Sequence, residues 1–321
     1  MRGSDLRDWE KQLRSQGLDA LATALTCTLE HHLQPDPVWC WGSKKPWRLD
    51  LTRPRIMGIV NVTPDSFSGD GLAGDRQAAI DQGLAMAAAG ADLLDVGGES
   101  TRPGSAPVAL EEELARVIPV IRALSAAVPI PVAVDTTKPE VMRAAIDAGA
   151  ALVNDVTALR GDAAGLEAGA GTARLLADTA TPAVLMHMQN RPATMQQAPH
   201  YDHVVAEVYE FLARRIAFCV AHGMAHARLI ADPGIGFGKS QAHNRALLRH
   251  RRAFRGLGVP LLLGFSRKRL LGELTGLTEP RHRDPAGHLL SMVADGAILR
   301  VHDVPGARQA MAVAHGFRFQ V

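Results

Sequence analysis

The chain has 321 residues, of which 47% are hydrophobic and 21% charged, a composition typical of a folded globular protein. The basic and acidic residues number 35 and 33, and the aromatic residues make up 4%, so we expect no nucleic-acid partner. No apolar run approaches the roughly 18 residues of a membrane span, which argues against a membrane partner. The cysteines, Cys27, Cys40 and Cys219, lack CxxC spacing, which predicts reduced thiols and a cytoplasmic location.

The N-terminal region has the pattern of an extension. Apolar residues recur every three to five positions from Leu6 to Leu29, which predicts a helix that Gly17 could break. Prolines between residues 35 and 46 then predict a linker. We therefore expect a helical extension with its linker over 1–45 and a second domain over 46–321.

From Arg55 onward, short apolar runs alternate with helical stretches. The runs cover 56–60, 93–96, 132–134, 151–153, 183–186, 229–231, 261–263 and 297–299, and helices are predicted over 75–90, 111–127, 139–148, 202–222 and 305–315. Such alternation predicts βα units around a parallel sheet that is buried on both faces. Eight units in roughly 265 residues match an α/β fold of the closed (β/α)8 TIM-barrel type. An open, doubly wound sheet is the alternative.

A polar residue follows every apolar run. The strand exits carry Asn61, 97–102, Asp135, Asn154, Asp155, His187, Asp232, 266–268 and 300–302. In a barrel, the active site lies at these carboxyl ends of the strands. Asn, Asp, Gly and Ser also favour turns and helix caps, which accounts for any single Asn or Asp equally well.

Turn formation does not explain the basic side chains at the last two exits. Arg300 and His302 are two residues apart, so in a strand they point the same way. With Arg267 and Lys268 they place four cationic or donor groups where barrels often bind phosphate. We call these four residues the cationic corner, and they predict an anionic ligand.

The opposite side of the mouth carries carboxylates and an amide. Asp135 and Asp232 only accept hydrogen bonds when ionised, whereas Asn154 both donates and accepts. A flat heterocycle with adjacent ring N–H and amino groups could bind one carboxylate through two hydrogen bonds. Each charge-assisted bond contributes roughly 1.5–3 kcal/mol, enough to select among rings.

Two long segments, 57–68 and 95–104, resemble the two signatures of dihydropteroate synthases, pterin-binding enzymes of folate biosynthesis. Shorter matches cover 134–136, 154–156, 186–189, 232–239, 264–268 and 300–304. The resemblance extends over about residues 48–318 and involves all eight strands in order.

The resemblance implies a transferase that joins 6-hydroxymethyl-7,8-dihydropterin diphosphate to p-aminobenzoate. The products are 7,8-dihydropteroate and diphosphate, in an SN1-like reaction assisted by Mg²⁺. It also implies that Asn61 ligates this ion through its side-chain oxygen, that the chain forms a homodimer through outer helices, and that it is a sulfonamide target. Mg²⁺ suits an oxygen-rich site that retains water.

By motif, the resemblance also assigns site residues. Pterin diphosphate would contact Thr101, Asp135, Asn154, Met188, Asp232, Lys268, Arg300 and His302. The aminobenzoate would contact Thr101, Arg102, Pro103, Phe237 and Arg269. Asp135, Lys268, Arg300 and His302 would be the catalytic residues.

Three features depart from the family pattern. The first loop reads Ser68-Gly69-Asp70-Gly71 where the family has Ser-Asp-Gly-Gly, so Asp70, expected in a mobile loop, is displaced by one residue. Arg269 stands where many members have Ser, which leaves sulfonamide sensitivity open. An Ala/Gly-rich segment, 158–182, lengthens the fourth crossover and has no assigned role.

Two other functions compete with this prediction. A pterin-dependent methyltransferase would need no diphosphate site, so Lys268, Arg300 and His302 together count against it. A catalytically silent pterin-binding paralogue is favoured only by the displaced Asp70, and Asn61 with the intact cationic groups opposes it.

Overall fold

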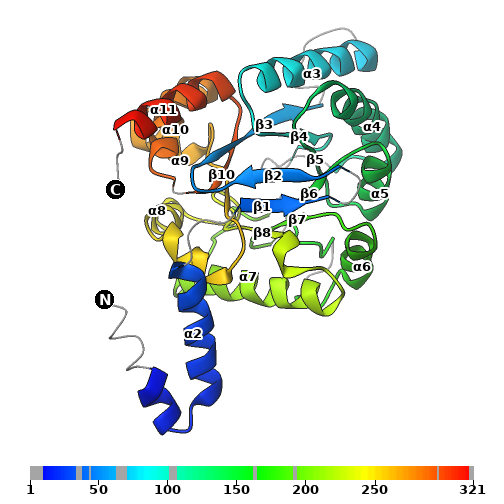
Figure 1. Ribbon diagram of the computed structural model, residues 1–321. Helices are drawn as coiled ribbons and strands as arrows, with labels where there is room; N and C mark the ends of the chain where they lie inside the picture. The colour runs from blue at the N-terminus through cyan, green and yellow to red at the C-terminus, as the bar shows by residue number, and fades with distance from the viewer. Residues whose placement is uncertain are drawn as a thin grey trace.

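A closed barrel of parallel strands forms the body of the molecule (Figure 1). The computed structural model describes residues 10–33, 38–42, 45–62, 71–100, 107–161, 165–190, 194–294 and 296–317. The sheet has the order β8-β7-β6-β5-β4-β3-β10-β9, with every neighbouring pair parallel. Its strands are β3 (Arg55–Asn61), β4 (Leu93–Gly97), β5 (Val132–Asp135), β6 (Leu152–Asp155), β7 (Ala183–Met186), β8 (Leu229–Asp232), β9 (Leu262–Leu263) and β10 (Ile298–Val301).

The two ends of this sheet meet. A parallel bridge joins Ala231 to Leu261, and the N–H of Ala231 donates to the carbonyl of Pro260 at 2.9 Å. The (β/α)8 TIM barrel is therefore confirmed, and the open, doubly wound sheet is excluded.

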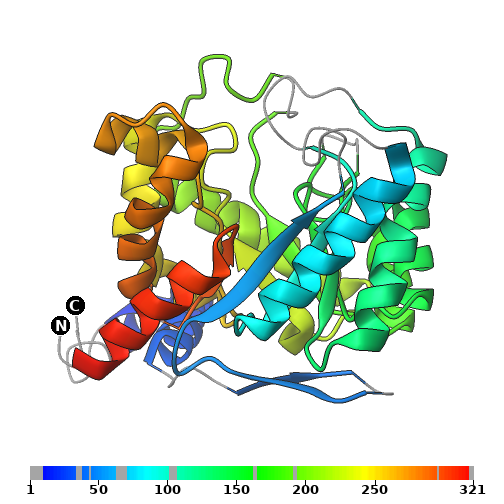
Figure 2. The same cartoon turned by 90° about the horizontal axis from the view of Figure 1, so that it is seen from above.

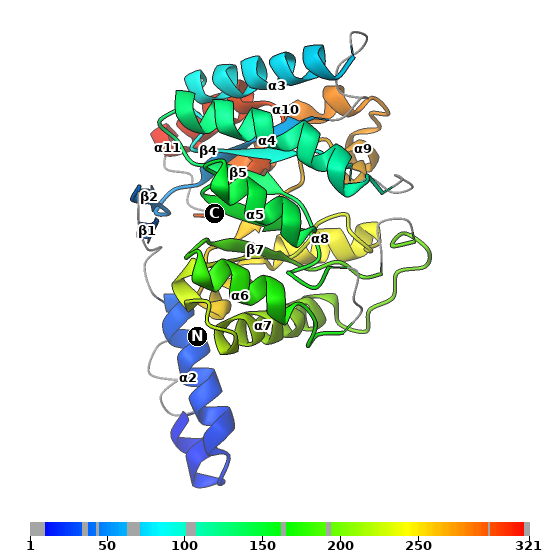
Figure 3. The same ribbon diagram turned by 90° about the vertical axis from the view of Figure 1, so that its right-hand side faces the viewer.

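Helices surround the barrel in the expected alternation (Figures 1 and 3). They are α3 (Gly71–Ala88), α4 (Leu110–Ala127), α5 (Pro139–Asp147), α6 (Ala170–Asp178), α7 (Val204–Ala221), α8 (Gln241–Arg249), α9 (Arg269–Thr275), α10 (Asp284–Met292) and α11 (Val304–Phe317), with 3-10 turns η2 (His226–Arg228), η3 (Arg251–Leu257) and η4 (Pro280–Arg283). The five helices predicted from sequence are all present. Within the described chain, no helix has the length and apolar character needed to cross a bilayer.

The Ala/Gly-rich segment is held by one buried arginine. Arg215 of α7 donates to the carbonyls of Ala158, at 2.7 and 3.1 Å, and Ala168, at 3.0 Å. α6 lies inside this segment. The segment therefore has a structural anchor, which the sequence did not predict.

The N-terminal extension contains the expected helix. Gly17 has φ +73° and ends a first helical turn, and α2 (Asp19–Leu33) follows it, which confirms the predicted break. Figure 3 shows α2 projecting away from the barrel. It meets the body through η3, where His31 Nδ1 lies 3.3 Å from the carbonyl oxygen of Gly256.

A β-hairpin occupies the region that the sequence predicted to be a linker. Strands β1 (Val38–Trp41) and β2 (Trp47–Asp50) pair antiparallel. Along β1 exposed and buried residues alternate, the period of a strand with one covered face. Pro35 and Pro37 precede β1 in the sequence, and Pro46 lies between the two strands, immediately before β2. The boundary drawn at residue 45 falls inside the hairpin.

The hairpin closes the amino-terminal end of the barrel (Figure 2). Trp39 and Trp41 are buried and stacked, with ring centroids 4.1 Å apart. Their indole N–H groups donate to the carbonyls of Ala227 (2.6 Å) and Ala151 (2.9 Å), so the buried polar atoms are satisfied.

Both tryptophans belong to an apolar cluster that includes one residue from each barrel strand. These residues are Met57, Leu93, Ala133, Leu152, Val184, Ile230, Leu262 and Ile298. The residues between them on each strand face outward and pack against the helices. Because side chains alternate along a strand, the residue two positions further along each strand also points into the barrel.

Candidate active site

A ring of polar side chains lies beyond the apolar layer, toward the carboxyl ends of the strands. Two residues past each apolar residue stand Ile59, Asp95, Asp135, Asn154, Met186, Asp232, Gly264 and Arg300. Five of these are polar, and we call Asp95, Asp135, Asn154, Asp232 and Arg300 the polar ring. The interior of the barrel therefore changes from an apolar layer to a charged layer over two residues of each strand.

Arg300 connects members of this ring. Its Nε donates to Asp95 Oδ2 at 2.6 Å, and its Nη2 donates to Asp135 Oδ2 at 2.7 Å. Asn154 Nδ2 donates to the same Asp95 oxygen at 2.9 Å. Asp95 is completely buried, and its Oδ1 has no hydrogen-bond partner among the described residues. A guanidinium can donate to two carboxylates at once, because its N–H donors are held in a rigid, planar fork.

Burial sets the ionisation of this ring. It raises the pKa of Asp135 to about 7, against the opposing effect of the Arg300 guanidinium and with a further contribution from Asp95. Burial also raises the pKa of Asp232, opposed by the Lys268 ammonium. For Arg300 burial acts to lower the pKa, but the carboxylates of Asp95 and Asp135 outweigh it, so the pKa is raised and the group stays charged.

Lys268 reaches the ring from the exit of β9. It precedes α9, and its ammonium donates to the carbonyl of Ile235 and lies 4.5 Å from the centroid of the Phe237 ring. Burial lowers the pKa of Lys268 to about 8; Asp232 opposes this shift and Arg300 adds to it. A pKa of about 8 brings the loss of the lysine's charge within reach of mildly alkaline pH.

An apolar wall adjoins the charged groups. Met188 is buried in a cluster with Val156, Met186 and Met195, and the half-buried Phe237 packs against this cluster. Thioether and aromatic side chains next to carboxylates and amides suit a flat, polar heterocycle.

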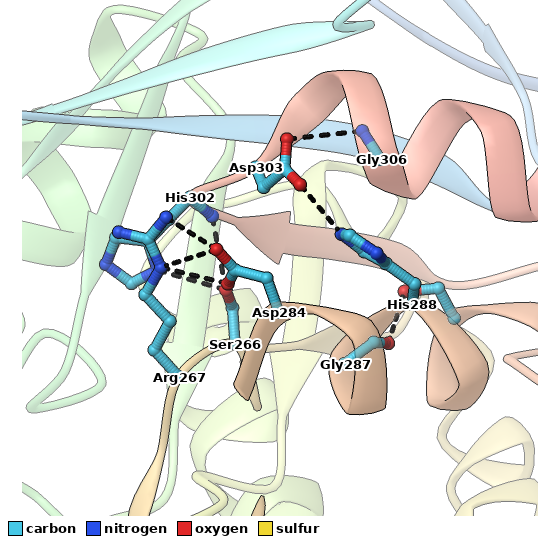
Figure 4. A network of polar contacts seen from close by, with 9 residues as sticks. Ser266, Arg267, Asp284, Gly287, His288, His302, Asp303 and Gly306 are labelled. Atoms are coloured by element: carbon cyan, nitrogen blue, oxygen red, sulfur yellow. Dashed lines mark hydrogen bonds and ion pairs between the residues drawn. The ribbon is translucent and has the colours of Figure 1, made fainter. Parts of the chain in front are cut away.

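The exits of β9 and β10 are tied together through a hydroxyl. Ser266 Oγ lies 3.2 Å from the backbone nitrogen of His302, whose N–H it accepts, and 3.0 Å from His302 Nδ1. Arg267 instead forms a bidentate ion pair with Asp284 (Figure 4). Of the four residues of the cationic corner, Arg267 therefore has its charge neutralised within the protein.

The candidate metal ligand lies on the strand next to β10, because β3 pairs directly with β10. Asn61 ends β3, is half-buried, and pairs in register with Gly97 of β4. The described residues contain no group of three or more His, Cys, Asp or Glu side chains that could hold a metal ion.

Comparison with known proteins identifies the family. The family model described as "Pterin binding enzyme" matches residues 57–302. The dihydropteroate synthase of Escherichia coli strain K12 is 45% identical over 267 residues, which cover 83% of this chain and 92% of the relative. The chain belongs to the dihydropteroate synthase family. It is therefore a transferase of folate biosynthesis.

Solved structures of dihydropteroate synthases share its fold. The Xanthomonas albilineans enzyme with 4-aminobenzoic acid has a TM-score of 0.79 and 48% identity, covering 89% of this chain and 100% of that one. The complex of the same organism's enzyme with 7,8-dihydropteroate has a TM-score of 0.74 and 48% identity, covering 85% and 97%.

Most of the residues assigned from the dihydropteroate synthase resemblance converge. The structure brings together Asp135, Asn154, Asp232, Lys268 and Arg300, with Met188, Phe237 and His302 at the same end of the barrel. Arg269 is different. Its side chain is 84% exposed and pairs with Glu273 at 2.7 Å. Its contact with aminobenzoate stays a prediction.

Four assigned residues lie outside the described residues. They are Asp70, Thr101, Arg102 and Pro103. Sequence analysis in turn missed Asp95, because it lies inside an apolar run instead of at its end. The sequence did contain a clue to this residue. Asp95 follows Leu93 by two positions, so on β4 both side chains point into the barrel.

Proposed function

We propose that the polar ring, Lys268 and His302 bind 6-hydroxymethyl-7,8-dihydropterin diphosphate, which the chain joins to p-aminobenzoate to form 7,8-dihydropteroate and diphosphate. The observation that carries this proposal is the contact of Arg300 with both Asp95 and Asp135, at 2.6 and 2.7 Å, beside Lys268 and His302. Related proteins that hold 4-aminobenzoic acid and 7,8-dihydropteroate support it.

Asp232, Asn154 and Lys268 would bind the pterin ring. Asp232 Oδ1 accepts the N–H of Gly234 at 2.7 Å, which fixes the plane of the carboxylate. A carboxylate held in this way can accept two hydrogen bonds from adjacent N–H groups of a ring. Met188 and Phe237 would supply the apolar faces.

The reaction replaces a C–O bond by a C–N bond. The bond between the pterin methylene and the diphosphate breaks, and its electron pair leaves with the diphosphate oxygen. The amine lone pair of aminobenzoate then bonds to the electron-deficient methylene, and the amine proton is released to water. A neutral arylamine is already nucleophilic, so the step needs no strong general base.

Charge placement would lower the barrier at both ends of the breaking bond. Lys268, Arg300 and His302 would stabilise the negative charge that grows on the diphosphate. Asp135, when ionised, is placed to stabilise positive charge on the pterin. The carboxylate and the cations need no reorganisation during the step, because the protein already holds them.

Asn61 would hold Mg²⁺ together with diphosphate oxygens and water. One amide oxygen at a strand exit, with no group of three or more His, Cys, Asp or Glu that could hold a metal in the described part of the chain, fits an ion that retains waters and binds mainly through substrate phosphates. When bound, Mg²⁺ neutralises charge on the leaving group.

A homodimer through the outer helices α9, α10 and α11 is also proposed. Leu274, Leu289 and Val313 on these helices are 56%, 67% and 49% exposed, as expected for apolar residues that a second copy covers. The three free cysteines support a cytoplasmic location. Sedimentation velocity of the purified chain, with Leu289→Glu as the disrupting variant, tests the dimer.

Product analysis tests the function. Purified chain is incubated with the pterin diphosphate, Mg²⁺ and p-aminobenzoate, and dihydropteroate and diphosphate are measured together. The proposal predicts that both form in equal amounts. Pterin binding without either product would instead favour the silent paralogue.

A further inference from the structure

Helix α10 lies behind the cationic corner, yet two of its polar side chains point toward strand exits (Figure 4). Asp284 accepts Arg267 Nε at 2.9 Å and Arg267 Nη2 at 2.7 Å. One helical turn later, His288 Nε2 lies 3.1 Å from Asp303 Oδ2. α10 therefore contacts the exits of both β9 and β10.

At the β9 exit, residues at the start of α10 contact Arg267, which has an unusual backbone conformation. Arg267 has φ +59°, a left-handed conformation that residues other than glycine seldom adopt. Its side chain is bound by Asp284, and its carbonyl accepts Arg283 Nη1 at 3.0 Å. The turn sends the flanking residues in different directions, Ser266 to His302 and Lys268 to the carbonyl of Ile235.

At the β10 exit, His288 fixes the residue that follows His302. Asp303 Oδ1 accepts the N–H of Gly306 at 3.2 Å while Oδ2 faces His288. A Cβ atom on residue 306 would lie 2.2 Å from His288 Cε1 and 2.4 Å from Asp303 Oδ2. Glycine is therefore required for the histidine to approach this carboxylate.

Ser266 connects the two exits. Its oxygen accepts the backbone N–H of His302, so its own hydrogen is available for His302 Nδ1. With Nδ1 as acceptor, the imidazole carries its proton on Nε2, where it can donate to an anionic oxygen. Ser266, Asp284, His288 and Asp303 also line one small cavity between α10 and the strands.

We propose that Asp284 and His288 are positioning residues, through which α10 holds Lys268 and His302 in the orientation that binds the diphosphate leaving group. Arg267 then acts through its pair with Asp284 and is not itself a ligand. The inference rests on the proposed function, because it takes this corner to be the diphosphate site.

Asp284→Asn tests the inference, because it removes the charge and keeps the size of the side chain. The KM for pterin diphosphate, and the Kd of inorganic diphosphate with Mg²⁺ measured by calorimetry, should each rise about tenfold, while the KM for p-aminobenzoate stays within about twofold. Asp284→Glu should recover most of the loss. The matched control is Asp178→Asn, the same change at an exposed position on α6.

A double variant separates positioning from general destabilisation. Because Asp284 acts through Arg267, the pair Asp284→Asn with Arg267→Gln should be no weaker in diphosphate binding than Arg267→Gln alone. His288→Gln provides an independent test at the second exit, with an expected rise of about threefold in the same Kd. Its control is His315→Gln, at an exposed position near the end of α11.

The outcomes distinguish the two proposals. Wild-type turnover with unchanged diphosphate binding in both Asp284→Asn and His288→Gln would overturn the inference alone. An equal rise in both KM values, matched by a lower melting temperature, would also overturn it. A wild-type chain that neither turns over nor binds diphosphate would overturn the proposed function and the inference with it.

Discussion

The two ends of the barrel are built on opposite principles. At the amino-terminal end, eight apolar side chains and the stacked Trp39 and Trp41 form an apolar layer, and the indole N–H groups of both tryptophans are hydrogen-bonded. At the carboxyl end, buried Asp95 and Asp232 share the interior with Arg300. Burying charge costs free energy even when it is paired, whereas burying apolar surface stabilises the fold. The comparison teaches that the amino-terminal layer contributes to stability alone, whereas the carboxyl end carries the proposed chemistry and depends on the pairing of its buried charges.

The largest effect is expected from Arg300→Ala, which removes the cation shared by Asp95 and Asp135. We expect kcat/KM to fall by about 10³-fold, because the leaving diphosphate loses a donor. The free energy of unfolding should fall by about 3–5 kcal/mol, because a buried carboxylate loses its partner. Steady-state kinetics and urea unfolding check both, with Arg300→Lys as the charge-retaining control. Turnover at the wild-type level would break the distinction between the two ends.

Asn61→Ala should affect the chemistry without affecting the fold. Turnover should fall by about 10²-fold at a fixed Mg²⁺ concentration, because the ion loses its protein ligand. The melting temperature should stay unchanged, since Asn61 lies at a strand exit. Chelation of Mg²⁺ should bring the wild type down to the level of the variant. If chelation leaves the wild type fully active, Asn61 is not a metal ligand.

Trp41→Ala should lower the stability of the fold without affecting the chemistry, the opposite of Asn61→Ala. Removing this buried indole should lower the free energy of unfolding by about 3–5 kcal/mol. The kcat/KM of the folded fraction should stay within about twofold of wild type, because the residue lies at the other end of the barrel. Trp41→Phe keeps one aromatic ring but removes the second ring and the bond to Ala151, so it should cost less than Trp41→Ala, about 1–3 kcal/mol. A selective loss of turnover in either variant would contradict the separation.

The smallest expected effect is a pH dependence confined to the carboxyl end. Asp135, with its pKa raised to about 7, loses its negative charge as the pH falls through 7. Lys268, with its pKa lowered to about 8, loses its positive charge as the pH rises through 8. The kcat/KM for pterin diphosphate should therefore be bell-shaped, with limbs near these values. Asp135→Asn should remove the acid limb, and Lys268→Arg should move the basic limb upward. A flat profile between pH 6 and 9 would rule out both assignments.

The sequence predicted the barrel well because its signal is local. Each strand is a short apolar run that ends in a polar residue, and that pattern also located Asp135, Asn154, Asp232 and Arg300. The hairpin at 38–50 was missed, because the prolines before it and between its strands resemble a linker, and the partners of Trp39 and Trp41 lie far along the chain. The pairing of Arg267 with Asp284 was also missed, because the two residues are distant in the sequence and no local pattern near either one indicates the contact.

A crystal structure of the chain with Mg²⁺ and pterin diphosphate tests the central claim most directly. The account predicts the pterin ring within hydrogen-bond distance of Asp232, Asn154 and Lys268. It also predicts diphosphate oxygens within reach of Arg300 and His302. A ligand bound elsewhere, with no contact to Asp232, Arg300 or His302, would contradict it.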